Sequence, residues 1–325
     1  MSVPQAGLPS VVLAGQRRDY GSPMIRENTV LILGAGASKP YNFPLVGELR
    51  DEVIKISTNA VGLEPFVFLR DTDFDLEYLE KFTADLSVSG YSSVDAFLEK
   101  RTQWADLGKL AIAHKLIVYE NSAKVFPPDQ PKDHWYETLL HKLKAPTWHA
   151  FKQNKVHIIT FNYDRSLEHY LSTILNNNYN ISKNTILKSL PIIHVHGDLG
   201  PYKNYGRHSP TIIKAAADSI KIVHESDNSS EEFKLADKVL AEAKTILFIG
   251  FGYHPQNMNK FKIFQSPVKY IDRSGKHHRV LGTHKGFKAD AWGRIFDQYN
   301  FYHAAKGQGG GSISEFLSEW IENNP

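Results

Sequence analysis

Short, continuous runs of apolar residues recur along the chain and are separated by longer stretches of mixed polarity. Runs of this length that are rich in Val, Ile and Leu are typical of strands buried on both faces of a sheet. They cover residues 28–33, 156–160, 192–195, 245–249 and 268–271. Because segments of helical length separate these runs, the pattern predicts an α/β fold, with a Rossmann-like parallel sheet and helices on both faces.

Amphipathic spacing marks the helices. Apolar residues recur at helical intervals between about residues 74 and 150, which predicts several helices and hence a helical insertion at about 62–150. Ser312 is placed to cap a last helix. Residues 1–28 show no period and are expected to form an N-terminal arm ahead of one domain over 29–325. Further helices are expected at 46–60, 164–176 and 230–243.

Composition places the chain among ordinary globular proteins. Its 325 residues, 42% of them hydrophobic, can bury a full core. Lys and Arg total 38 against 35 for Asp and Glu, a net charge of +3 that is too balanced to indicate nucleic acid or a membrane surface as a partner. No uninterrupted apolar stretch reaches the ~18 residues of a membrane span, and no basic segment precedes the first apolar one, so we expect a cytoplasmic protein.

Cysteine is absent from the sequence. Its absence excludes disulfides, thiol nucleophiles and every zinc site that is built on thiolates. His277, His278 and His284 lack a companion carboxylate at the spacing of metal ligands, and we expect them to be solvated loop residues. The sequence therefore predicts no metal cofactor.

Small or polar residues directly follow four of the predicted strands, at 34–38, 160–164, 194–198 and 250–254. The carboxyl ends of parallel strands meet at one edge of the sheet, where open α/β sheets bind their ligands. In the first segment, Gly34, Ala35 and Gly36 are small enough for the backbone to approach a pyrophosphate, and Ser38 can cap the helix that follows. A glycine turn that binds nothing would look the same, and Lys39 stands where a full GxGxxG motif has its third glycine.

One acidic residue extends this pattern. Asp272 lies at the end of the last predicted strand, about twenty residues after the fourth segment, an offset at which an acid can hold the hydroxyl groups of a ribose. Acids at strand ends also cap helices, so both interpretations stay open.

The four segments, in this order, resemble the motifs of the sirtuin family. Sirtuins carry a GAG-x-S phosphate loop, a TQN-x-D segment, a His-Gly pair and a later glycine-rich turn. The resemblance spans roughly residues 29–275 and implies a domain that binds NAD, with Asp272 among the binding residues. The matching residues are Gly34, Ala35, Gly36 and Ser38, then Thr160, Asn162 and Asp164, then His196 and Gly197, and finally Gly250, Phe251 and Gly252.

The departures from the sirtuin pattern indicate which branch of the family the chain resembles. Sirtuin deacetylases hold a structural zinc on four cysteines, and their Asp-Phe-Arg after the first loop is absent from residues 39–44, so deacetylation is not expected. The segments TFNYD, HVHGD, GFGYHPQN and SVDAFL resemble bacterial sirtuin-like NAD hydrolases of antiviral defence, which deplete cellular NAD when triggered. This resemblance implies a homo-oligomer and activation by oligomerisation or by a partner protein, such as an ATPase or a sensor. The sequence has no P-loop, so any ATP hydrolysis that the system needs would come from another chain.

The residues suit cleavage of the nicotinamide–ribose bond of NAD. Oxidised nicotinamide is a cationic leaving group, so the enzyme mainly has to orient the ribose and a water around an oxocarbenium-like sugar. The amide of Asn162 can position either group, and Asp164 would orient Asn162 or the nicotinamide. His196 is the candidate general base because the ordinary pKa of histidine, about 6.5, lies near neutral pH. Strand alternation lets only one of His194 and His196 face the site, and we expect His194 to be structural.

Other functions remain open at this point. A non-catalytic module that senses NAD or ADP-ribose would keep the phosphate loop, but it would not need both Asn162 and His196, so the presence of both favours an enzyme. Asn162 can also serve only as a cap or an Asx turn after its strand. A deacylase or an ADP-ribosyl transferase would need an open channel for a protein substrate, which sequence does not reveal.

Overall fold

A five-stranded parallel sheet forms the centre of the computed structural model, which describes residues 25–58, 64–127, 133–222, 230–265, 278–299 and 311–322. The strand order is β3-β2-β1-β4-β5, the order of a Rossmann sheet. The central strand β1 pairs along its whole length with β2 and β4, and all of its residues are buried. The predicted α/β class is confirmed. The strands are β1 (Thr29–Leu33), β2 (Val156–Thr160), β3 (Ile192–His194), β4 (Thr245–Ile249) and β5 (Arg279–Gly282).

The first four predicted strands are confirmed, with ends that differ by a residue or less. The fifth predicted strand, residues 268–271, lies outside the described residues, as does most of the predicted N-terminal arm. The sequence did not predict β5, which pairs with β4 at the edge of the sheet. Its four residues are too few to show a period and follow a polar stretch.

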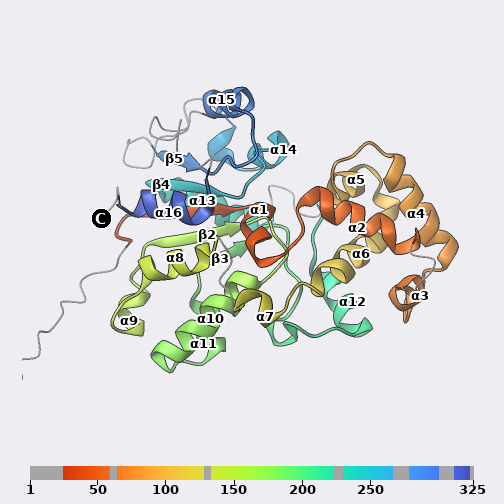
Figure 1. The fold of residues 1–325 in the computed structure, drawn as a ribbon, viewed down its shortest axis with the longest axis horizontal. Helices are drawn as coiled ribbons and strands as arrows, with labels where there is room; N and C mark the ends of the chain where they lie inside the picture. Colours follow the sequence, from red (N-terminus) through yellow and green to blue (C-terminus); the bar gives the residue numbers. More distant parts are fainter. Residues whose placement is uncertain are drawn as a thin grey trace, which may run out of the picture.

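Helices surround the sheet and extend beyond one end of it. Figure 1 shows α2, α4, α5 and α6 gathered past the end of the sheet where α1 lies, and α12 packs against α6 in this group. The helices are α1 (Ala35–Ser38), α2 (Val46–Thr58), α3 (Glu64–Leu69), α4 (Leu76–Val88), α5 (Val94–Lys100), α6 (Ala105–Ile117), α7 (Ser122–Val125), α8 (Trp135–Leu143), α9 (Trp148–Phe151), α10 (Ser166–Tyr179), α11 (Lys183–Ser189), α12 (Pro210–Ser219), α13 (Glu231–Glu242), α14 (Pro255–Met258), α15 (Ala289–Gln298) and α16 (Ile313–Glu322).

The described parts of the chain between β1 and β2 contain helices and no strand, and these helices lie in two places. Helices α2 to α6 form the group beyond the sheet, whereas α8 returns to pack against α10 and α16. Trp135 of α8 is fully buried and donates a hydrogen bond of 2.7 Å to the carbonyl oxygen of Ala37 in α1. This part of the predicted insertion therefore supports the first loop from behind.

The last helix begins as predicted. The hydroxyl of Ser312 accepts a hydrogen bond from the Glu315 amide, and the Glu315 carboxylate accepts one from the Ser312 amide, which together form a capping box. Asp133, far away in the sequence, also accepts hydrogen bonds from the amides of Ile313 and Ser314. None of the helices in the described ranges is both long and apolar enough to cross a membrane.

Candidate functional site

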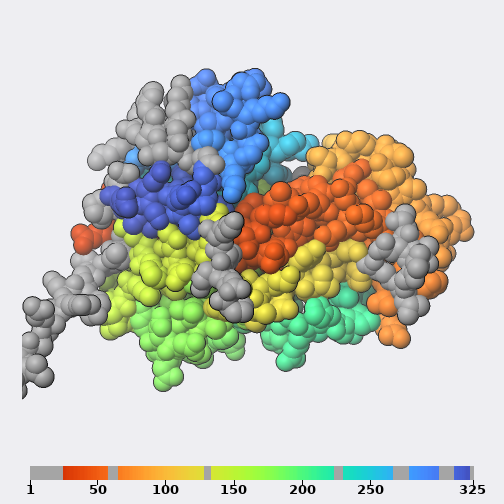
Figure 2. Space-filling model, in the orientation of Figure 1, coloured from red at the N-terminus to blue at the C-terminus, as the bar shows by residue number. Residues whose placement is uncertain are grey.

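A cavity of about 330 Å³ lies at the carboxyl edge of the sheet. Its walls come from the loops after β1, β2, β3 and β4, from α2 and α5, and from α14. In Figure 2 the surface is hollowed between the residues of α14 and those of α2 and α5. The cavity adjoins the switch point between β1 and β4, where Rossmann sheets bind ligands, and its volume suits a site for a small molecule, roughly 300–1,000 Å³.

Most of the residues singled out in the sequence meet at this cavity. Four predicted residues, Gly36, Thr160, Gly197 and Gly250, are not part of its lining, and Asp272 lies outside the described residues. The predicted residues that line it are Gly34, Ala35, Ser38, Asn162, Asp164, His196, Phe251 and Gly252.

The glycines of the first loop are required by packing of the protein against itself. The Gly36 amide donates a hydrogen bond of 2.9 Å to the carbonyl oxygen of Gly250, so this amide is already occupied by the loop after β4. A Cβ at Gly36 would lie 2.8 Å from that oxygen, and a Cβ at Gly250, where φ is +57°, would lie 2.1 Å from the Ala37 nitrogen. The structure uses these small residues to bring two loops together. Gly34 and Ala35 also line the cavity, and the approach of this loop to a pyrophosphate stays a prediction.

Close packing of the backbone also requires a glycine at position 197. Its φ is +73°, and an added Cβ would lie 2.0 Å from the carbonyl oxygen of Ser219. The adjacent His196 carbonyl accepts a hydrogen bond of 2.8 Å from the Lys221 amide. Gly197 therefore joins β3 to the segment after α12 and is not part of the cavity lining.

Asn162 is held in one orientation by its neighbours. Its side-chain Nδ2 donates hydrogen bonds of 2.9 Å to the Gly34 carbonyl and 3.0 Å to the Ser38 hydroxyl, and its backbone amide donates one of 3.0 Å to Thr160 Oγ1. The Gly34 carbonyl is only an acceptor, which assigns the nitrogen to this side of the amide. Among the described residues Oδ1 has no hydrogen-bond partner, so Asn162 presents an acceptor oxygen in the cavity wall.

Ser38 links Asn162 to Asp164. The Ser38 hydroxyl donates a hydrogen bond of 2.7 Å to Asp164 Oδ2 while it accepts the one from Asn162. Asp164 also accepts hydrogen bonds from the Ser166 hydroxyl and amide. Burial raises the pKa of Asp164, and these hydrogen bonds oppose the rise. The sequence suggested a helix cap for Ser38, but its hydroxyl makes no capping bond and serves this link.

His196 is more deeply buried than its predicted role requires. The residue is 7% exposed, and its ring packs edge-on against those of Phe161 and Phe233, with centroids 5.3 and 5.8 Å away. Burial, assisted by the positive charge of Lys260, lowers the pKa of His196 to about 3. The ring is therefore neutral at physiological pH and a much weaker base than an ordinary histidine.

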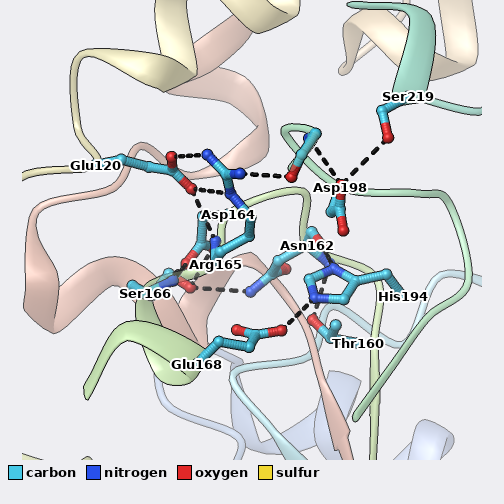
Figure 3. Close-up of polar contacts among 12 residues, drawn as sticks. Glu120, Thr160, Asn162, Asp164, Arg165, Ser166, Glu168, His194, Asp198 and Ser219 are labelled. Atoms are coloured by element: carbon cyan, nitrogen blue, oxygen red, sulfur yellow. Dashed lines mark hydrogen bonds and ion pairs between the residues drawn. The ribbon is translucent and has the colours of Figure 1, made fainter. Parts of the chain in front are cut away.

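His194 lies behind Asn162, outside the lining of the cavity. Residues two apart on a strand share a face, so strand alternation does not separate His194 from His196; they are separated because β3 ends at His194. Its Nδ1 is 2.9 Å from the backbone oxygen of Asn162, and its Nε2 is 2.5 Å from Glu168 Oε1 (Figure 3). Burial lowers the pKa of His194, but the charge and hydrogen bond of Glu168 outweigh it, and the pKa rises to about 9. The structural role expected for this histidine thus includes direct contact with the backbone of a candidate site residue.

Sequence reasoning missed several polar residues of the cavity. Asp95 accepts a short hydrogen bond from the hydroxyl of Tyr163, which stands between Asn162 and Asp164, and burial raises the pKa of Asp95. The residues of α5 belonged to the predicted helical insertion and to the SVDAFL segment of the sirtuin-like resemblance, but Asp95 was not singled out. The additional polar lining residues are Ser92, Ser93, Asp95, Glu99, Tyr163, His254, Gln256 and Asn257.

A buried ion pair fixes the backbone beside the site. The Arg165 side chain donates hydrogen bonds to both carboxylate oxygens of Glu120 and to the carbonyl of Gly200 (Figure 3). Glu120 and Arg165 are 0% and 2% exposed. Removing one partner of such a pair typically costs about 3–5 kcal/mol, so this contact firmly joins the end of the α6 segment to the segment after β2.

Two of the histidines near β5, His278 and His284, pack against the protein, contrary to expectation. His278 is 4% exposed, and the ring of His284 stacks on that of Trp292 with centroids 4.6 Å apart. Each of them therefore packs against the protein, whereas His277 lies outside the described residues. In the described part of the chain, no group of three or more His, Asp or Glu side chains is arranged to hold a metal ion.

Comparison of the chain with models of known protein families and with curated protein sequences found no match. Fold and site alone therefore define its class. The chain is a parallel α/β protein with a Rossmann-like sheet and a cavity with polar residues at the carboxyl edge of that sheet.

Proposed function

We propose that the chain binds NAD in this cavity and hydrolyses the bond between nicotinamide and ribose. The observation that carries the proposal is that Asn162 and His196, which follow different strands, line one cavity together with Ser38 and Asp164. The resemblance of these residues to sirtuin motifs supports NAD as the ligand. NAD acts here as a substrate, and the proposed reaction uses no metal.

The reaction requires little acid catalysis from the protein. The bond from the ribose C1′ to the nicotinamide nitrogen breaks, its electron pair neutralises the pyridinium ring, and a water oxygen forms the new bond to C1′. The water proton passes to solvent, and the products are nicotinamide and ADP-ribose. The protein contributes mainly by holding the ribose and the water in a reactive arrangement.

Asn162 suits that positioning role. Its Nδ2 is bound by Gly34 and Ser38, so its side chain cannot rotate freely and offers Oδ1 as a fixed acceptor. A ribose hydroxyl or the attacking water can donate to this oxygen. A fixed acceptor loses little entropy when the reacting groups bind, which is the source of most catalysis by positioning.

We propose a role for His196 that differs from the general base expected from the sequence. Because its pKa is lowered to about 3, transfer of a full proton to the ring is unfavourable in the ligand-free cavity. A neutral imidazole still accepts a hydrogen bond from a hydroxyl group or a water. We therefore assign His196 to orienting the water or the ribose, with proton release to solvent.

The resemblance also supports a biological setting. We propose an NAD-depleting effector of antiviral defence that is activated by homo-oligomerisation or by a partner protein, an ATPase or a sensor. Control of this kind has a physical rationale, because continuous NAD loss is toxic to the cell. Light scattering that finds only monomers, with and without NAD, would contradict the homo-oligomer.

A second candidate is a module that binds NAD or ADP-ribose without cleaving it. The lowered pKa of His196 favours this candidate, because the site then lacks an ordinary base at that position. The two candidates differ in one measurable respect: both predict binding of ADP-ribose, and only the hydrolase releases nicotinamide.

The test follows nicotinamide release from NAD by chromatography, with binding of ADP-ribose measured by calorimetry on the same samples. We expect Asn162→Ala and His196→Ala to lose at least about tenfold in kcat, consistent with losing roughly 1.4 kcal/mol of transition-state stabilisation. Matched controls are Asn178→Ala and His149→Ala, both exposed on the surface and expected to behave as the wild type. Binding without release would select the second candidate, and absence of both would contradict NAD as the ligand.

A further inference from the structure

We propose that His194 and Glu168 form a positioning pair that holds Asn162 by its backbone carbonyl, and that the pair does so only while it keeps the proton between His194 Nε2 and Glu168 Oε1. The inference deepens the proposed function and rests on it for its kinetic readout. It concerns two residues that lie outside the lining of the cavity.

Contacts from different parts of the sheet edge converge on Asn162. The segment after β1 holds the side chain of Asn162 through the Gly34 carbonyl and the Ser38 hydroxyl. Thr160, at the end of β2, accepts a hydrogen bond from the backbone amide of Asn162. His194, at the end of β3, contacts its backbone carbonyl, and Glu168 on α10 holds the other side of the imidazole. The pair therefore connects Asn162 to a third strand and to a helix.

Hydrogen-bond chemistry sets the protons of this arrangement. A backbone carbonyl only accepts, so Nδ1 of His194 has to carry a hydrogen toward Asn162. Glu168 Oε1 lies 2.5 Å from Nε2, and a carboxylate only accepts, so Nε2 carries the second hydrogen. The pair is complete when both hydrogens are present.

Loss of the shared proton to solvent would break the contact with Asn162. The neutral ring then keeps one hydrogen, and the Glu168 carboxylate attracts it to Nε2. Nδ1 is left with a lone pair facing the Asn162 carbonyl oxygen, and two acceptors repel each other. Asn162 would lose its link to β3 without any change in the cavity lining.

The charged surroundings favour the protonated pair. Glu168 from α10 and Asp198 from the loop after β3 both act on the imidazole with negative charge, and they outweigh burial so that the pKa of His194 is about 9. Arg165 next to them is bound by Glu120, and α13, which also packs against β3, carries Glu232 in an ion pair with Lys221. At neutral pH the pair is therefore complete, and alkaline pH removes it.

The kinetic test compares pH profiles of NAD hydrolysis, corrected for the enzyme-free reaction. The wild type should lose about tenfold in kcat between pH 7 and a pH about one unit above the pKa of His194, with little change in KM. In Glu168→Gln the amide can donate to Nε2 and so keep the hydrogen on Nδ1 without the shared proton. The ratio of kcat at high pH to kcat at neutral pH should therefore rise roughly fivefold or more over that of the wild type.

Two further variants complete the kinetic test. His194→Phe keeps a ring but no donor, and we expect reduced kcat at every pH without an alkaline fall. Glu137→Gln is the matched control, because it removes the carboxylate of an exposed pair with His141 and should keep the wild-type profile. A Glu168→Gln profile that falls as the wild type does, in an active enzyme, would overturn the proposal.

A second measurement does not depend on hydrolysis. Nitrogen-15 NMR of the histidine rings should show both nitrogens of His194 protonated at neutral pH, and the Tyr163 amide, which shares the peptide group of the Asn162 carbonyl, should titrate with the ring. If no NAD is cleaved but this coupled titration is seen, the proposed function fails and the positioning pair stands. Two results would overturn the pair. One is a singly protonated His194 at neutral pH, and the other is a Tyr163 amide whose chemical shift does not change as His194 titrates.

Discussion

The side-chain nitrogen of Asn162 donates a hydrogen bond of 3.0 Å to the hydroxyl of Ser38, 124 residues earlier in the chain. The same hydroxyl donates to Asp164, so one small side chain orients the amide and satisfies a buried carboxyl group. This relay explains why a serine after the neighbouring strand β1 belongs to the same site as Asn162. Substitution of Ser38 therefore disturbs the site and leaves Asn162 itself unchanged.

Ser38→Ala should lower kcat for NAD hydrolysis by roughly tenfold, because it removes a partner from both Asn162 and Asp164 and leaves the amide less well oriented. The free energy of unfolding should fall by about 1–3 kcal/mol, the usual cost of leaving a buried polar group without its partner. Steady-state kinetics and urea unfolding measure the two effects. Ser87→Ala, an exposed serine at the end of α4, is the control, and equal effects of the two substitutions would contradict the relay.

Gly250→Ala should destabilise the fold by more than about 2 kcal/mol, because a methyl group there meets the backbone of Ala37 at 2.1 Å where φ is positive. Gly252→Ala is the matched comparison, since an added Cβ meets nothing within 4 Å and the residue lines the cavity. We expect it to change stability by less than about 0.5 kcal/mol but to raise KM for NAD. Thermal and urea unfolding measure the stability of both variants. Equal stability would show that packing between the two loops does not require a glycine at position 250.

Acid should unfold the protein in part through His196. Its pKa is lowered from about 6.5 to about 3 on folding, so the folded state disfavours the proton. The contribution of His196 to the free energy of unfolding is therefore fully present above pH 6.5 and is lost as the pH falls toward 3. His196→Gln cannot take up the proton, and its loss of stability between neutral pH and about pH 4 should be smaller than that of the wild type by roughly 3 kcal/mol.

Urea unfolding at the two pH values measures this difference directly. His149→Gln serves as the control, because this exposed histidine on α9 should leave the acid dependence of the wild type unchanged. His169 also has a lowered pKa, about 4, but it contributes equally to all three proteins. Identical acid dependence of wild type and His196→Gln would show that His196 is accessible to protons in the folded state.

The polar residues of the site were only partly predictable. Asn162 and His196 could be singled out because each follows a recognisable strand, and parallel strands bring their carboxyl ends to one edge. Asp95 could not, because its partner Tyr163 is 68 residues away and nothing in the local pattern of α5 distinguishes a cavity-facing acid from a solvated one. Sequence identified residues at the ends of strands and missed those that a separate helix adds.

The amino-acid sequence by itself determined the α/β class, four of the strands and the edge at which the candidate residues meet. These depend on short-range hydrophobic periodicity and on the geometry common to all parallel sheets. Only the tertiary structure decided that the glycines pack loop against loop, that burial makes His196 a weak base, and that Glu168 keeps His194 charged. Those properties depend on desolvation and on contacts between residues far apart in the chain, which no local pattern of residues encodes.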